Sequence, residues 1–309
     1  MANNSQVISV NRDTLTGVIF ALFAAIGFSA KAILVKLAYL DSVDAVTLLA
    51  LRMAFSVPFF IGIALWAKRQ HAEPLCGHDK LLVLALGLIG YYLSSFLDFL
   101  GLQYISAGLE RLILFLYPTM TVILSALIYK RAIGGKIIAA MALSYAGIVL
   151  VFLHDTGMKQ PDSIILGAAL VFASTLSYSI YLVGAGHAIA RIGTARFTAY
   201  AMVVASVASL FQFGVTHPLN ALILPWRVYE LAIVMAIFSP VLPVFLLSYA
   251  IRRIGSGNAS LIGSVGPVST IYMAHVFLHE SVSLLQIAGS SLVLIGVLIT
   301  SVSSKREGK

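Results

Sequence analysis

Residues 105–130 read ISAGLERLILFLYPTMTVILSALIYK, one long apolar segment with two charges near its start and a proline at its centre. The chain contains this design twice. Adding 149 to each residue number places Pro118 on Pro267, and the match runs without a gap from 96–147 to 245–296. Because the aligned Gly and Pro positions keep one register across several segments, we predict two copies of one structural unit.

The composition is that of a membrane protein. Of the 309 residues, 60% are hydrophobic and only 10% are charged, and the mean hydropathy is +0.99. A soluble domain has roughly 25% charged residues, so this chain has too few charges to cover a surface in water. Its apolar runs reach about 20 residues, the length that a helix needs to cross a bilayer. We therefore expect an all-α integral membrane protein.

Ten apolar segments predict ten transmembrane helices joined by short connections. They are divided into a first five-helix unit, 14–153, and a second one, 163–302. The predicted spans are 14–38, 44–67, 80–102, 107–129, 134–153, 163–189, 194–215, 228–250, 257–278 and 283–302.

The Lys and Arg residues predict the orientation. With the N-terminus in the cytoplasm, most of those outside the spans fall in cytoplasmic connections, as the positive-inside rule requires. An odd number of spans in each unit then inverts the second unit, and Arg252 and Arg253 indeed replace Gln103 and Tyr104. We expect a bacterial-type inner (cytoplasmic) membrane protein with both termini in the cytoplasm. Two inverted five-helix repeats are a common plan of secondary transporters.

Three stretches also carry a family likeness. GLQYISAGLERLILFLYPTMTVILSALIY at 101–129 resembles the fourth-helix signature of the EamA-type transporters in the drug/metabolite transporter (DMT) superfamily. ALRMAFSVPFF at 50–60 resembles the second helix of that family, and residues 251–299 resemble the end of its second unit. The resemblance implies ten helices in two inverted units around a central cavity, and export of amino acids, other metabolites or drugs. One departure is that GSVGP at 263–267 stands where the first copy has FLYP, so the two cavity walls should differ.

Five charged residues stand within the spans or at their edges, namely Lys31, Arg52, Asp98, Glu110 and Arg111. An isolated charge in hydrocarbon costs about 2.5–3.5 kcal/mol, so such residues usually face a cavity or pair with one another. All five fall in the outer half of the membrane under the predicted orientation. Their equivalents in the second unit are uncharged, so we expect the polar site mainly on the first unit.

Two roles stay open for these charges. In one, Lys31 and Arg52 bind a substrate carboxylate, Asp98 or Glu110 binds an amine or carries a proton, and Arg111 is a further candidate. In the other, the pairs Lys31–Asp98 and Arg52–Glu110 only fasten helices together. Glu110 and Arg111 are adjacent and do not share a helix face, so either can lie in a helix interface.

Aromatic residues are candidates for the apolar lining of a pocket, although packing between helices is the alternative. They are Tyr91, Tyr92, Phe96, Tyr117, Tyr178 and Tyr181. Pro118 and Pro267 occupy matched positions, where proline frees a backbone carbonyl and kinks the helix. With Gly266, which allows close approach, they are the candidate hinges of a transport cycle.

Several activities are disfavoured. No GxxxxGK[ST] phosphate loop is present, so ATP is not expected to drive the protein. We expect no cofactor, no metal site and no nucleic-acid partner, because metal-ligand spacing is lacking and the basic residues form no stripe.

The partners expected from this reading are a small-molecule substrate and the lipid bilayer. We predict a secondary transporter that exports small amphipathic metabolites, amino acids or related compounds, by alternating access. Asp98 and Glu110 motivate the hypothesis that protons are coupled to export. The alternatives are a passive facilitator or importer of small metabolites and, in another class, a membrane-embedded enzyme acting on lipids.

Overall fold

The computed structural model describes residues 12–70, 75–130, 132–156 and 161–307. Across these ranges the chain folds into helices without any strand, which confirms the all-α prediction. We predicted that both chain ends lie in the cytoplasm. Residues 1–11 and 308–309 of these ends lie outside the described residues.

Eight helical stretches of the described residues are long and apolar enough to cross a membrane, and two shorter apolar helices, Val265–Leu278 and Leu284–Thr300, complete the predicted ten. The elements are α1 (Arg12–Tyr39), α2 (Ala45–Gln70), α3 (Gly77–Gly87), η1 (Leu88–Leu93), α4 (Ser94–Leu102), α5 (Ala107–Leu114), α6 (Tyr117–Tyr129), α7 (Gly135–Thr156), α8 (Pro161–Ile192), α9 (Thr194–Thr216), η2 (Leu219–Leu222), α10 (Trp226–Ala236), η3 (Ile237–Val241), α11 (Leu242–Gly263), α12 (Val265–Leu278) and α13 (Leu284–Glu307).

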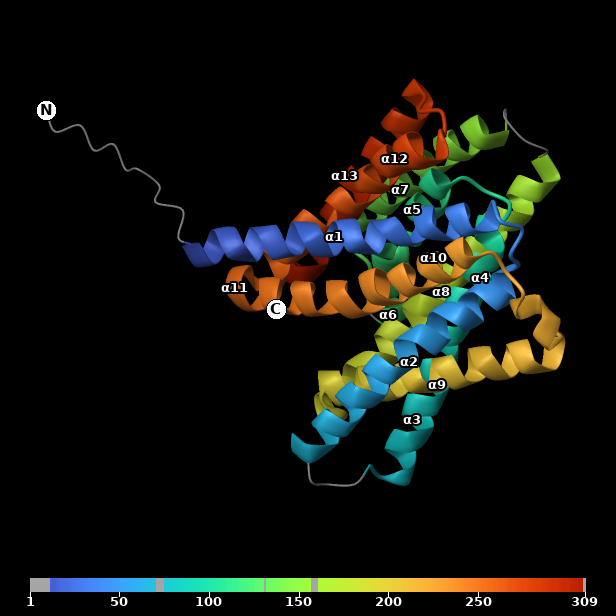
Figure 1. Cartoon of the computed structure of the whole chain (residues 1–309). Coiled ribbons are helices and arrows are strands. Elements are labelled where there is room, and N and C mark those ends of the chain that lie inside the picture. The colour runs from blue at the N-terminus through green and yellow to red at the C-terminus, as the bar shows by residue number, and fades with distance from the viewer. Residues whose placement is uncertain (1–11, 71–74, 131, 157–160, 308–309) are drawn as a thin grey trace, which may run out of the picture.

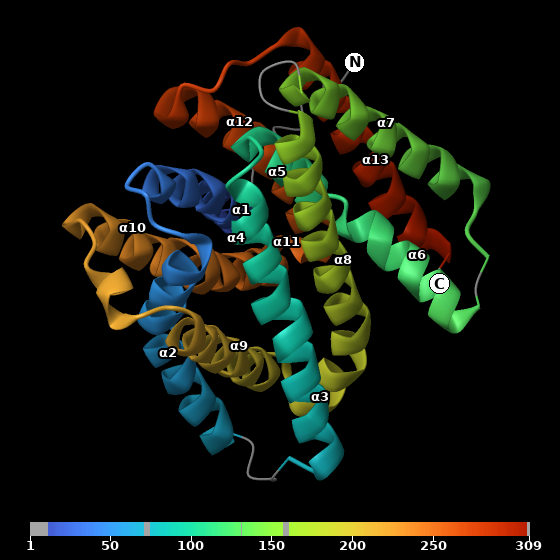
Figure 2. The same ribbon diagram turned by 90° about the vertical axis from the view of Figure 1, so that its right-hand side faces the viewer.

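The two halves of the chain interlock through pairs of helices. Helix α1 packs along α11, α2 along α9 and α7 along α13, so each pair takes one helix from each half (Figures 1 and 2). Figure 1 shows α1 and α11 diverging from α2 toward the end of the molecule at which α1 begins.

The helices are interrupted at equivalent places in the two halves. The π-helical turns η1 and η3 begin at Leu88 and Ile237. The helices α6 and α12 are followed by left-handed residues, Lys130 with φ 51° and His279 with φ 55°. The members of each pair are 149 residues apart, which is the offset of the sequence repeat. The two-repeat architecture is thereby confirmed.

Contacts between the halves show the inverted relation. A Cβ on Gly17 would lie 2.6 Å from Ile254 Cγ2, and a Cβ on Gly167 would lie 2.8 Å from Ile105 Cγ2. The second contact is the first with the halves exchanged. The first span aligns with the sixth at an offset of 150, which places Gly17 on Gly167, and Ile105 aligns with Ile254 at the offset of 149. A two-fold relation between the repeats produces such paired contacts.

Four predicted spans, 80–102, 107–129, 228–250 and 257–278, are less regular than expected, and η3 divides the third of them. The π-helical turn η1 divides the span 80–102, and two residues, Phe115 and Leu116, separate α5 from α6. In the second half, Gly255 has φ 78°, a region that favours glycine, and α11 consists of two helices that meet at this turn. The turn lies in the expected connection between the predicted spans 228–250 and 257–278. Ser264 then separates α11 from α12. The interruptions next to Pro118 and Pro267 therefore begin before the prolines themselves.

The connection between α1 and α2 carries a polar helix cap. Asp44 Oδ1 accepts hydrogen bonds from the backbone nitrogens of Val46 (2.8 Å) and Thr47 (3.0 Å), and it lies 3.3 Å from His217 Nε2. Partial burial raises the pKa of Asp44, but the hydrogen bonds from Thr47 and the neighbouring His217 outweigh it, so the pKa lies below its ordinary value.

Replacing Asp44 with alanine is expected to destabilise the protein by about 1 kcal/mol at neutral pH, because the first turn of α2 loses its cap. A carboxyl group with a lowered folded pKa stabilises above its unfolded pKa of about 3.9 and loses that contribution as the pH falls through the folded value. Thermal unfolding should therefore show a gap between wild type and variant that shrinks in acid. Asp44→Asn, which keeps a capping side chain, is the control, and a gap independent of pH would contradict the assignment.

Candidate functional site

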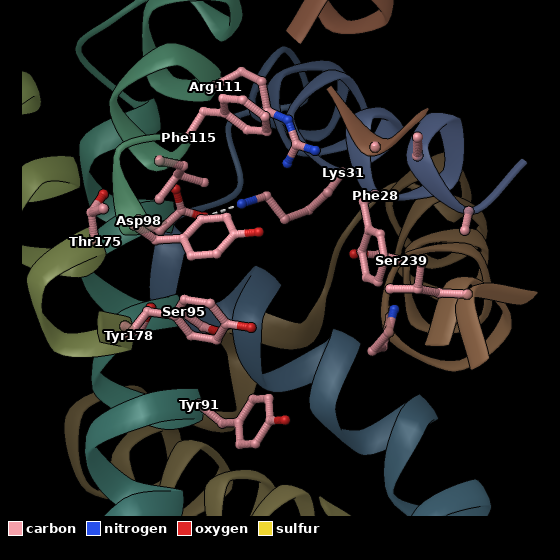
Figure 3. Close-up of a pocket in the computed structure, with 18 of the residues that line it drawn as sticks. Phe28, Lys31, Tyr91, Ser95, Asp98, Arg111, Phe115, Thr175, Tyr178 and Ser239 are labelled. Carbon is pink, nitrogen blue, oxygen red and sulfur yellow. Dashed lines mark hydrogen bonds and ion pairs between the residues drawn. The ribbon is translucent and has the colours of Figure 1, made fainter. Parts of the chain in front are cut away.

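A cavity of about 480 Å³ lies between the two halves and is lined by residues of both. Pockets for small organic molecules measure roughly 300–1,000 Å³, so the cavity can hold a metabolite. It extends along α1 from Lys31 to Ala21, toward the end of the molecule at which α1 begins. Figure 3 shows charged and aromatic side chains converging on it.

A buried ion cluster forms one wall of this cavity. Lys31 Nζ pairs with Asp98 Oδ2 and lies 2.9 Å from Glu110 Oε1. Glu110 is fully buried and Asp98 is 3% exposed. Asp98 lines the cavity, whereas Glu110 lies behind it. The cluster joins α1, α4 and α5 and places two carboxylates on one amine.

The predicted Lys31–Asp98 pair is present, but the predicted Arg52–Glu110 pair is not: no ion pair links these two described side chains. The reason is that Glu110 faces Lys31, while the Arg52 guanidinium lies over the ring of Phe99, 5.4 Å from its centroid. Arg52 is buried, lines the cavity and leaves its Nε without a hydrogen-bond partner among the described residues.

Arg111 also lines the cavity and forms no ion pair within the described residues. Figure 3 shows it reaching inward from α5, beside Phe115 and facing Lys31. A Cβ on Gly266 would lie 2.9 Å from Arg111 Nη2. Gly266 therefore leaves the space in which this guanidinium sits, which is a local reason for glycine at this position.

The predicted aromatic residues separate into two groups. Tyr91, Tyr117 and Tyr178 line the cavity. Tyr181 lies behind them, since it is 4% exposed and its hydroxyl is 2.9 Å from that of Tyr91. Tyr92 does not line the cavity and stacks on Phe96 instead, with ring centroids 6.4 Å apart. Tyr91 and Tyr92 both belong to the π-helical turn η1, and of the two only Tyr91 lines the cavity.

The predicted hinge residues lie at the interrupted helices. Pro118 lines the cavity, whereas Gly266 and Pro267 are buried beside it. The two prolines cannot donate to the carbonyls four residues earlier, which belong to Leu114 and Gly263, and both of these residues line the cavity. Irregular backbone at membrane depth is tolerated where it faces a cavity.

Sequence reasoning missed several cavity residues. Ser239 and Pro240 come from the π-helical turn η3, where a Ser-Pro dipeptide inside an apolar span was the available signal. Phe28 lines the cavity on α1, three residues before Lys31. The helical face that carries Lys31 would have pointed to it, since residues three or four apart share a face. Ser94 and Ser95 follow the π-helical turn η1 and gave no distinct signal.

These features define a multi-pass membrane protein with two inverted repeats around a partly polar central cavity, which is the plan of a secondary transporter. The chain belongs to the EamA-like transporter family, which matches residues 15–153 and 165–302. The family resemblance read from the sequence is thereby confirmed.

Curated relatives carry transporter names. The chain is 29% identical over 284 residues to "Uncharacterized transporter YcbK" of Bacillus subtilis (strain 168), covering 90% of each chain. It is 26% identical over 255 residues to an "Uncharacterized transporter" of Archaeoglobus fulgidus, covering 82% of this chain and 87% of that one. A solved crystal structure matches with a TM-score of 0.64 at 17% identity, over 96% of this chain and 99% of that one, and shows the fold alone. The family and the names point to a transporter rather than an enzyme.

Proposed function

We propose that the protein exports small amphipathic metabolites, amino acids or related compounds, by alternating access across a bacterial-type inner membrane. The observation that carries this proposal is the cavity between the halves, in which the charges of Lys31, Asp98 and Arg111 meet aromatic walls. Charged groups fix the orientation of a polar ligand and aromatic rings cover its apolar body.

The end of the molecule toward which the cavity extends agrees with entry of the substrate from the cytoplasm. It extends toward the end at which α1 begins, and the positive-inside rule assigns this end to the cytoplasm. The conformation is then inward-facing. In the proposed cycle the units 14–153 and 163–302 rock against each other, and the interrupted helices next to Pro118, Gly266 and Pro267 take up the change in backbone angles.

The proposal also includes coupling of export to protons through Asp98 or Glu110. Two carboxylates share one amine in the ion cluster, so Lys31 can balance only one of the two negative charges. A proton bound to Asp98 or Glu110 can neutralise the other charge while Lys31 stays in place. Like charges close together favour protonation of one of the two groups. Asp98 or Glu110 would then release its proton on one side of the membrane and bind it on the other.

Metabolites in the medium of cells that overproduce the protein provide the first test, with cells lacking it as the reference. One class of solute is expected to rise only with the protein, and unchanged media despite membrane insertion would contradict export. The identified solute is then followed in proteoliposomes, where accumulation against its gradient separates coupled export from passive facilitation. Asp98→Asn and Glu110→Gln should remove the pH dependence of transport, and exposed Asp162→Asn should keep it. If both cluster variants retain the wild-type pH dependence, the carboxylates do not couple protons.

A further inference from the structure

We propose that the substrate is an organic monocarboxylate anion with an apolar body, and that the guanidinium of Arg111 binds its carboxylate. This inference rests on the proposed transport function and narrows its substrates, within the small amphipathic metabolites, to related compounds that carry a carboxylate and no amine.

The charges around the cavity do not balance. Lys31, Arg52 and Arg111 supply three positive charges, and Asp98 and Glu110 supply two negative ones. The cavity wall therefore carries one excess positive charge when both carboxylates are ionised, and two when one is protonated. A charge without a counter-ion is costly at membrane depth. A monoanionic ligand lowers this cost in either protonation state, whereas a cationic ligand raises it.

The carboxylates have an ion-pair partner in Lys31, whereas the guanidiniums of Arg52 and Arg111 have none among the described residues. Lys31 contacts Asp98 Oδ2 and Glu110 Oε1 together, so a tethered ammonium already compensates part of the carboxylate charge that an amine-bearing ligand would seek. Asp98 Oδ1 and Glu110 Oε2 have no hydrogen-bond partner within the described part of the chain. Arg52 and Arg111 each keep a buried Nε without a hydrogen-bond partner among the described residues. A guanidinium offers a planar fork of donors that fits a carboxylate in a bidentate manner.

Of the two arginines, Arg111 is the better placed to bind the anion. Arg52 lies over the ring of Phe99, which already occupies one face of its guanidinium. Arg111 reaches into the cavity beside Phe115, in the space that Gly266 leaves open (Figure 3). Phe115, Tyr117 and Phe28 line the same cavity and supply apolar surface for the remainder of the ligand. One excess positive charge favours a monocarboxylate over a phosphate dianion.

A matched set of compounds tests the inference on the purified full-length protein. The set keeps a phenyl ring and changes the charged group: 3-phenylpropionate (anion), 3-phenylpropionamide (neutral), 3-phenylpropylamine (cation), phenylalanine (zwitterion) and phenyl phosphate (phosphate anion). The affinity of each is taken from the rise in unfolding temperature with ligand concentration. We expect 3-phenylpropionate to bind about tenfold or more tighter than the amide, as one hydrogen bond to a charged group allows. Tighter binding of the amine, of phenylalanine or of phenyl phosphate would overturn the monocarboxylate assignment.

Variants then assign the anion to Arg111. Arg111→Gln should weaken binding of 3-phenylpropionate about 10- to 100-fold and leave the amide unchanged, and Arg111→Lys should lose only part of the effect. Arg227→Gln is the matched control, because that guanidinium is 53% exposed and pairs with Asp41 outside the cavity. Unchanged anion binding in Arg111→Gln would overturn the residue assignment, and the compound series on the wild type needs no variant to fold. Uptake of the amine instead of the anion into proteoliposomes would refute only this inference, whereas transport of no solute would refute the proposed function.

Discussion

Lys31→Ala is expected to destabilise the protein by about 3–5 kcal/mol, which is the cost of removing one partner of a buried ion pair. We also expect this variant to abolish transport. Asp98 and Glu110 would be left facing each other without an ion-pair partner among the described residues, and both are almost completely buried. The lysine amine is the only group that the described contacts give to Glu110 as an ion-pair partner. Protonation of one carboxylate would then be the cheapest way to relieve the repulsion.

Thermal unfolding and transport together separate the two roles of Lys31. Lys80→Ala, at an exposed position, is the matched control and should change neither quantity. The neutral triple variant Lys31→Met, Asp98→Asn, Glu110→Gln should recover part of the lost stability, because the two carboxylates no longer repel each other. The guanidiniums of Arg52 and Arg111 keep their charge in this variant, and it should not transport. A Lys31→Ala protein with wild-type unfolding temperature and wild-type export would contradict both roles.

Gly147→Val is expected to cost about 3 kcal/mol or more, at the upper end for overpacked sites. A Cβ on Gly147 would lie 2.4 Å from the carbonyl oxygen of Gly289, and a Cβ on Gly289 would lie 2.5 Å from that of Gly147. The obstacle is backbone on both sides, so no side chain can rotate away. Small residues allow membrane helices to approach this closely, and α7 and α13 would have to separate.

The yield of folded, monodisperse protein and its unfolding temperature measure this effect. Gly62→Val is the matched control, since nothing lies within 4 Å of a Cβ at that position in α2. Gly289→Val should behave like Gly147→Val, because the two glycines form one contact. Equal stability of Gly147→Val and Gly62→Val would show that the crossing of α7 and α13 is not tightly packed.

The ten spans and the two-fold repeat could be predicted from the sequence because both depend on local hydropathy and on matched Gly and Pro positions. The π-helical turn η1 could not. It brings Gly90 beneath the ring of Tyr181, where a Cβ on Gly90 would lie 2.2 Å from the first ring carbon. That contact joins residues 91 positions apart, and no periodicity in 80–102 reports it.

The charged residues of the candidate site could be predicted from the sequence, but the ion pairs that they form could not. Lys31, Asp98 and Glu110 were identified because charges within apolar spans are costly and usually face a cavity or pair with one another. Which carboxylate meets which cation depends on the rotation of each helix about its axis. Tyr91 lines the cavity and Tyr92 does not; both lie in the π-helical turn η1, whose irregular winding cannot be read from the sequence.

The paired contacts of the two repeats bear on how the cavity can change sides. If each repeat adopted the conformation of the other, the molecule would present its cavity to the opposite compartment. The contacts Gly17–Ile254 and Gly167–Ile105 would simply trade places, so we expect them to persist through the cycle as the permanent contacts of the molecule. The ion cluster has no such image, because its equivalents in the second repeat are Tyr181, Leu247 and Ala259. The energies of the two conformations therefore differ at the cluster, and ligand or proton binding there can decide which of them is populated.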